Sequence, residues 1–137
     1  MKIIIFIIFL LFCSITYAKE IKLDFQYNFE NYIDLKNKFP FLIDTKETSF
    51  YRDFDGQKDF KHQIYLYEFK YNNSLYYLII DTNFCGSGGC KIEIFSRKSN
   101  KIILSKYIGF MDLYINNNKL LFKDMNNNIV FEFEIRE

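Results

Sequence analysis

The most chemically distinctive stretch of the sequence is Cys85-Gly86-Ser87-Gly88-Gly89-Cys90. Two cysteines five positions apart at the tip of a predicted hairpin are expected to pair in an oxidising compartment. The three glycines suit so small a ring, because they adopt backbone angles that residues with a Cβ avoid. By the loop-closure relation such a ring contributes only about 2 kcal/mol to stability. We therefore expect the bridge to define the shape of a loop more than to hold the fold together.

Two functional interpretations compete with a purely structural role for this loop. A redox-active pair is disfavoured, because thiol-exchange motifs separate their cysteines by two residues at the start of a helix, whereas four residues intervene here between strands. The other is a rigid recognition loop, in which the backbone amides of residues 86–89 stay open to a partner or an anion. The sequence favours a structural cap and leaves the recognition loop open.

An acidic segment is the only other candidate for ligand chemistry. Asp53, Asp55 and Asp59 surround a glycine and partly match the start of a calcium loop. A complete loop would place a bidentate glutamate where Ile64 stands, and neighbouring basic residues offset the charge. The pattern is more typical of a surface turn with an Asp-Gly corner, so we expect no metal or other cofactor.

His62 is the only histidine, so any Ser-His-Asp or Cys-His mechanism would have to use it. Ser87 lies between two glycines but lacks the spacing of a hydrolase nucleophile elbow. A zinc site would need three or four ligands, and the cysteines are already assigned to each other. These observations favour a protein that is not an enzyme.

The glycine-rich hairpin, preceded by the apolar run Leu75 to Ile80 and followed by the alternating pair Ile92 and Ile94, resembles a motif found in small exported bacterial proteins of uncharacterised function. The resemblance covers about 25 residues. It implies a periplasmic or secreted β-rich domain and carries over no catalytic residue.

The N-terminus has the organisation of a signal peptide. Lys2 precedes an unbroken apolar run over residues 3–12, and Thr16-Tyr17-Ala18 places small residues before a cut after Ala18. A membrane-spanning helix needs about 20 apolar residues, which this run does not reach. Cys13 follows Phe12 rather than the small residue that precedes a lipid-accepting cysteine. We therefore predict cleavage, a periplasmic or secreted location and no stable membrane anchor.

Residues 19–137 are expected to form one β-rich domain, a common size for a single core. The signal peptide carries one basic residue and no acidic one, so 17 basic residues face 17 acidic ones in the remaining chain. This balance argues against nucleic acid or an acidic membrane surface as a partner. The apolar load of 17 Phe and 11 Tyr excludes disorder.

Short apolar and β-branched runs separated by turn residues predict strands near 63–71, 75–82, 91–98, 101–108, 112–116, 119–124 and 129–135. The connections are too short for parallel crossovers, so the strands form an antiparallel meander. Asparagines at the corners tolerate the left-handed backbone region. Alternation over residues 23–29 suggests an opening strand, and residues 32–40 allow a short helix that stops at Pro40.

Side-chain alternation indicates which strand faces are buried. Residues 129–135 alternate apolar and acidic side chains, which is typical of a sheet with one wet face. Residues 75–80 are continuously apolar, so this strand is expected to be covered on both sides. Along the preceding strand, Tyr65, Tyr67 and Tyr71 share one face with Phe69; we expect most of this stripe to be core and Tyr71 to be partly exposed.

These observations predict a mostly β fold, an antiparallel meander forming a flattened barrel or sandwich of six to eight strands, with at most one short N-terminal helix. The favoured function is noncatalytic binding of a protein or cell-envelope component through loops. The alternative is an inhibitor of an envelope hydrolase such as lysozyme, with residues 86–89 plugging the enzyme's cleft. A hydrolase dependent on His62 is the third hypothesis.

Overall fold

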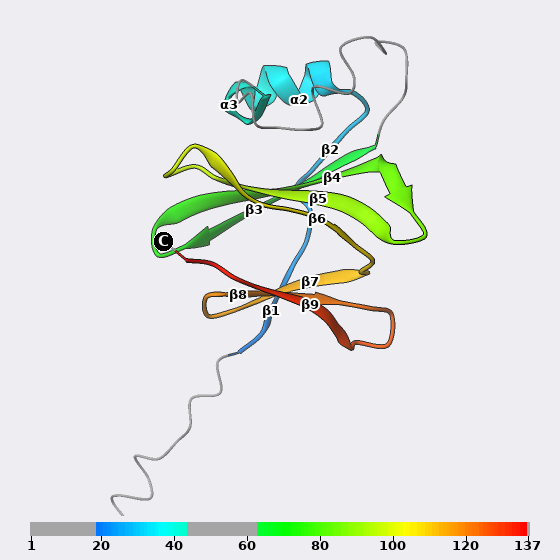
Figure 1. Ribbon diagram of the computed structural model, residues 1–137. Coiled ribbons are helices and arrows are strands. Elements are labelled where there is room, and N and C mark those ends of the chain that lie inside the picture. Colours follow the sequence, from blue (N-terminus) through cyan, green and yellow to red (C-terminus); the bar gives the residue numbers. More distant parts are fainter. Residues whose placement is uncertain (1–18, 44–62, 137) are drawn as a thin grey trace, which may run out of the picture.

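The computed structural model describes residues 19–43 and 63–136 (Figure 1). These residues form two antiparallel sheets and two short helices. The larger sheet has the order β2-β3-β4-β5-β6, with β2 at Tyr27–Phe29, β3 at Ile64–Tyr71, β4 at Ser74–Gly86, β5 at Gly89–Ser96 and β6 at Lys101–Ile108. The smaller sheet has the order β1-β7-β8-β9, with β1 at Ile21–Leu23, β7 at Asp112–Asn116, β8 at Lys119–Lys123 and β9 at Ile129–Glu134.

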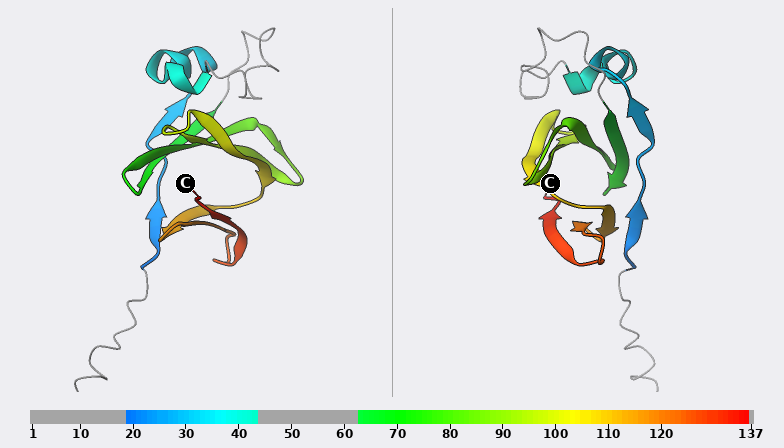
Figure 2. Two further views of the ribbon diagram at one scale, coloured as in Figure 1. Left: turned by 60° about the vertical axis from the view of Figure 1, so that its left-hand side comes forward. Right: turned by 90° about the vertical axis from the view of Figure 1, so that its right-hand side faces the viewer.

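The elements stack in three layers, with the five-stranded sheet between the helices and the four-stranded sheet (Figures 1 and 2). One apolar cluster joins the helices to the five-stranded sheet, and a second fills the space between the two sheets. Neither sheet closes on itself among the described strands. The β-rich antiparallel prediction is confirmed, and the architecture is a sandwich with a helical cover rather than a barrel.

Strand β4 is buried on both faces, as its continuous apolar run predicts. Tyr77 and Ile79 belong to the cluster beneath the helices, whereas Tyr76, Leu78 and Ile80 belong to the cluster between the sheets. Successive side chains of a strand point to opposite faces, so one strand supplies both cores.

The aromatic stripe of β3 also follows the prediction. Phe69 is buried between the two sheets, and Tyr65 and Tyr67 pack against the same cluster. On the opposite face, Leu66 packs beneath the helices. Tyr71 is only partly buried, as expected for the end of the strand.

The opening strand predicted over residues 23–29 is two strands. β1 pairs with β7 of the smaller sheet and β2 pairs with β3 of the larger one, so residues 24–26 cross between the layers. Alternation continues through the crossing, which is why the sequence pattern did not show the break. The described residues therefore contain nine strands, above the predicted six to eight.

The helical region also holds one element more than predicted. Helix α2 (Tyr32–Lys38) begins after Asn31, whose side chain accepts the Asp34 N–H at 2.8 Å. Pro40 ends the helical run as predicted, but it also begins the short helix α3 (Pro40–Ile43). Proline is tolerated in a first turn because its missing N–H has no partner there. Neither of these helices, in the part of the chain described, is long and apolar enough to cross a membrane.

Asparagine occupies the corners of the meander in the predicted way. Among the described residues, those with a positive φ other than glycine are all asparagines: Asn72, Asn73, Asn100, Asn117 and Asn127. Their φ values lie in the left-handed region, which asparagine tolerates better than other side chains. The short turns are thus encoded locally and impose the antiparallel order.

Candidate functional site

The predicted disulfide between Cys85 and Cys90 is present at the tip of the β4–β5 hairpin. The two cysteines are directly opposite each other in the ladder, and the next pair outward is Gly86 with Gly89. The turn between them leaves Gly86, Ser87 and Gly88 exposed. The bridge therefore closes a small, solvent-facing ring at the end of two long strands.

Gly89 holds this hairpin against the connection between β6 and β7. Its φ is +97°, a conformation that L side chains rarely adopt. A Cβ at this position would also collide with backbone atoms of Ile108 and Gly109. The close approach is possible only because position 89 has no side chain. The base of the ring is thus restrained by the bridge on one side and by a neighbouring backbone on the other.

The base of the hairpin borders an apolar cleft of about 320 Å³. The cleft lies at one end of the sandwich, where the chain passes from β6 to β7. Its lining consists of Tyr67, Ile80, Gly89, Cys90, Ile108, Gly109, Phe110 and Met111. The loop at residues 86–89, for which the sequence leaves a recognition role open, therefore adjoins a hollow with a mostly apolar lining.

Exposed apolar side chains lie in the lining of the cleft and next to its lining residue Tyr67. Met111 is 66% exposed, although it lines the cleft. Phe25, which is 49% exposed, packs against Tyr65 and Tyr67 with ring centroids 4.8 and 6.2 Å apart. Flexible methionine and aromatic side chains are typical of surfaces that adapt to a partner.

Tyr67 is the polar group of the cleft. Burial raises the pKa of its phenol, and the nearby carboxylates of Asp24 and Asp112 raise it further. Asp112 is itself paired with Lys22 at 2.6 Å. Tyr67 therefore keeps its proton to a higher pH than an exposed tyrosine and can donate a hydrogen bond. This arrangement suits binding.

A second polar cluster lies on the helix-covered face of the five-stranded sheet. Tyr32 of α2 donates a 2.7 Å hydrogen bond to Oδ2 of Asp81, which is fully buried. Glu93 is 1% exposed; it accepts a 3.2 Å hydrogen bond from Ser105 and lies 3.8 Å from the Lys91 ammonium. Burial, followed by the charge of Asp81, raises the pKa of Tyr32. The Tyr32–Asp81 hydrogen bond ties the helical cover to the sheet.

Two of the candidate sites considered from the sequence lie in the segment between residues 43 and 63. The weak calcium candidate of Asp53, Asp55 and Asp59 lies outside the described residues, as does His62. Within residues 19–43 and 63–136, no group of three or more His, Cys, Asp or Glu side chains is arranged to hold a metal ion.

Sequence reasoning identified the hairpin but missed the cleft. Gly109 and Phe110 lie between the strands predicted at 101–108 and 112–116, and Tyr67 belongs to a stripe predicted to be mostly core. Their meeting depends on how the second sheet folds back over the first, which no local pattern encodes. The chain matches no family model, no curated protein and no solved structure.

Proposed function

We propose that this protein is an exported, noncatalytic binding domain that acts in the periplasm or outside the cell. Its partner is a protein or another component of the cell envelope. Contact is made by the exposed tip at residues 86–88 together with the apolar cleft beside it. The signal-peptide pattern of residues 1–18 and the disulfide are both consistent with an oxidising destination.

One observation carries the proposal: the glycine-rich tip stands exposed beside an apolar cleft while its base is restrained twice. The Cys85–Cys90 bridge closes the ring, and Gly89 packs against the backbone of Ile108 and Gly109. A loop that is already ordered loses less conformational entropy when it binds. A restrained polar tip next to an apolar hollow is therefore suited to recognition.

The tip is tested by comparing two arginine substitutions. Ser87→Arg places a large charged side chain on the exposed ring and should abolish capture of the partner from envelope extract by immobilised protein. Ser99→Arg, at another exposed turn, is the matched control and should retain capture. Equal capture by both variants would contradict a role for the ring.

The cleft is tested with a pair of methionines. Met111 lines the cleft and is 66% exposed, whereas Met125 is 80% exposed on the β8–β9 turn. Neither Met111→Lys nor Met125→Lys removes a buried group, so both variants should fold. Only Met111→Lys should weaken capture, because it introduces a charge into the apolar hollow. Loss with both variants, or with neither, would contradict the assignment.

The projecting ring also favours a second candidate, an inhibitor of an envelope hydrolase such as lysozyme. In this role Ser87 and its neighbours would enter the enzyme's cleft as a preformed plug. The oxidised protein should then inhibit a muramidase, and the Ser87→Arg variant should leave the muramidase active.

The third hypothesis is a hydrolase, which predicts an enzymatic activity that His62→Ala abolishes. Binding through the ring predicts instead that His62→Ala leaves capture of the partner unchanged.

A further inference from the structure

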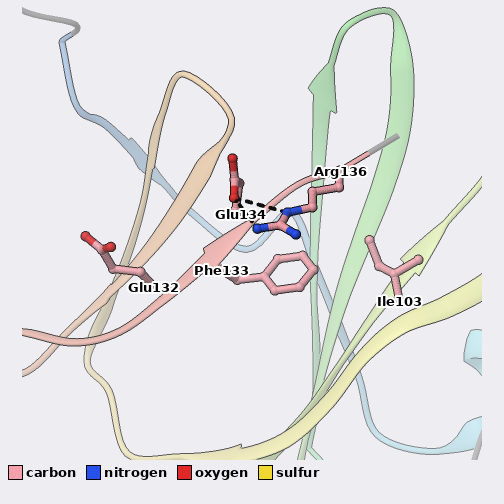
Figure 3. Close-up of a pocket in the computed structure, with 5 residues that line it drawn as sticks. All are labelled: Ile103, Glu132, Phe133, Glu134 and Arg136. Atoms are coloured by element: carbon pink, nitrogen blue, oxygen red, sulfur yellow. Dashed lines mark hydrogen bonds and ion pairs between the residues drawn. The ribbon is translucent and has the colours of Figure 1, made fainter.

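The sandwich has an open side, formed by β6 at the edge of the larger sheet and β9 at the edge of the smaller one. Among the described strands, β6 pairs only with β5 and β9 only with β8. A hollow of about 420 Å³ lies between these two edges (Figure 3). Its lining consists of Ile103 from β6 and Glu132, Phe133, Glu134 and Arg136 from β9 and the residues after it.

The two edges differ in how well they are protected against another strand. β6 has a bulge at Ile103, where its register with β5 shifts, and its Lys106 points inward over the Phe131 ring at 4.2 Å. Bulges and inward-pointing charges are the devices by which natural edges resist pairing. The edge of β6 is therefore blocked.

The edge of β9 lacks these devices over most of its length. Its own register shift falls at its start, near Val130, and pairing with β8 is regular from Phe131 to Glu134. The ladder continues beyond the strand, because the Ile135 N–H donates to the Asn118 carbonyl at 2.7 Å. A regular edge without proline or lysine is open to strand addition.

The direction of the free amides follows from this last hydrogen bond. In an antiparallel pair, amides two residues apart point the same way and neighbours point oppositely. Since the Ile135 amide points to β8, the amides of Phe133 and Phe131 do so too. The N–H groups of Glu132 and Glu134 therefore point outward, toward the position of an added strand.

The side chains along this edge define what the added strand should carry. Phe133 and Ile103 form the apolar part of the hollow, and Figure 3 shows the Phe133 ring directed toward the side on which Ile103 lies. Glu132 and Glu134 line it as well, although Figure 3 shows the Glu132 carboxylate extending away from Phe133 and Ile103. One guanidinium, that of Arg136, lies 2.9 Å from Glu134. Lys119 lies 3.5 Å from Glu132 and is partly exposed. Cross-strand neighbours prefer opposite charges and matched apolar groups.

We propose that the outer edge of β9 is a docking edge for an extended segment of another polypeptide in which apolar and basic residues alternate. The incoming strand accepts hydrogen bonds from the amides of Glu132 and Glu134. Its apolar side chains fill the hollow beside Phe133, and its basic side chains face the two carboxylates. This edge shares no residue with the cleft beside the disulfide, so the proposal does not depend on that site.

The probe is an acetylated and amidated octapeptide of alternating valine and lysine, titrated by calorimetry into oxidised protein purified from the cell envelope. The matched probe replaces every lysine with glutamate. We expect the lysine peptide to bind at least tenfold more tightly, and hydrogen exchange of the 132 and 134 amides to slow when it is bound. No binding of the lysine peptide, equal binding of both peptides, or unchanged exchange at these amides would overturn the proposal.

Glu132→Pro removes one outward N–H without removing a bond of the sheet, since proline is tolerated at such edge positions. It should lower the affinity for the lysine peptide at least tenfold, whereas Glu132→Gln should lower it less. Should Glu132→Pro fail to fold, the same test can be made on the unmodified protein with two N-methylated versions of the lysine peptide. One version is methylated on the valine amides and the other on the lysine amides. Strand addition predicts that only one of these two peptides loses binding, and equal binding of both would overturn the proposal. Self-association that Glu132→Pro abolishes would assign the edge to a second copy and would also overturn the proposal.

Discussion

Gly89 and Gly109 are in backbone contact across two connections of the fold, and a Cβ on Gly109 would lie 3.7 Å from the Cα of Gly89. The first glycine belongs to the disulfide hairpin and the second to the passage from β6 to β7. Their contact couples the position of the ring to the wall of the apolar cleft. The proposed binding surface is therefore one unit, and its geometry should depend on these two glycines.

Gly89→Ala should be strongly destabilising. The new Cβ would collide with the backbone of Ile108 and Gly109, and the φ of +97° is unfavourable for alanine. We expect a loss of roughly 2–4 kcal/mol in the free energy of unfolding, measured by urea denaturation. Gly88→Ala is the control, because a Cβ there meets nothing within 4 Å, and it should change stability little. Similar values for the two variants would show that the close contact is absent.

Replacing both Cys85 and Cys90 by serine should leave the protein folded. The ring is small, so the loop-closure relation gives a loss of only about 2 kcal/mol. Urea denaturation of the double variant and of the reduced parent should show the same decrease in the free energy of unfolding relative to the oxidised parent. Complete unfolding of the variant would mean that the bridge holds the fold together, and no shift would mean that the bridge is not formed in the parent.

Tyr32→Phe should loosen the helical cover. The substitution removes the hydrogen bond to the fully buried Asp81, and losing a hydrogen bond to a buried carboxylate costs about 1–3 kcal/mol. Tyr65→Phe, which removes an exposed 3.1 Å hydrogen bond to Gln63, is the control and should cost less than half as much. Equal losses would indicate that Tyr32 contributes no more than a surface contact.

Stability should fall in alkaline solution. Burial raises the pKa of Tyr77 to about 12, and the neighbouring Glu68 raises it in the same direction. The folded state therefore holds this proton more tightly than the unfolded state, whose tyrosines titrate near pH 10. The contribution is fully present below pH 10 and is lost as the pH rises toward 12. Burial raises the pKa of Tyr32 and Tyr67 in the same sense.

Urea midpoints measured between pH 8 and 11.5 test this dependence. The midpoint should be nearly constant up to about pH 10 and then decline. The midpoint of Tyr77→Phe should decline less steeply above pH 10. The midpoint of Tyr107→Phe, at a position that is 55% exposed, should follow that of the parent. A Tyr77→Phe profile parallel to the parent would contradict the assignment.

Local patterns predicted the strands from residue 63 onward to within a few residues, because most of the short turns between them contain an asparagine or glycine with a positive φ. The continuous apolar run of residues 75–80 also predicted that β4 is buried on both faces. The crossing between β1 and β2 was missed, since alternation alone does not reveal which sheet a strand joins. Pro40 was expected only to end a helix, although the same missing N–H lets it begin α3.

Of the candidate site, the hairpin could be predicted from the sequence and the cleft could not. The hairpin is formed by consecutive residues, from Cys85 to Cys90, and its chemistry follows from their types. The cleft combines Tyr67 of β3 with Phe110 and Met111 of a connection more than forty positions later. Contacts over such separations arise from the stacking of the two sheets, and a single sequence carries no local signal for them.

Export and disulfide formation are tested together by the intact mass of the protein recovered from the cell-envelope fraction without reductant. We predict a chain that begins at Lys19, lighter by two hydrogen atoms than its reduced form, and that gains two alkyl groups on Cys85 and Cys90 only after reduction. A full-length chain that retains Met1 and is found in the cytoplasm, or an envelope form in which both thiols react without reduction, would contradict the claim that this is an exported domain with a disulfide-closed ring.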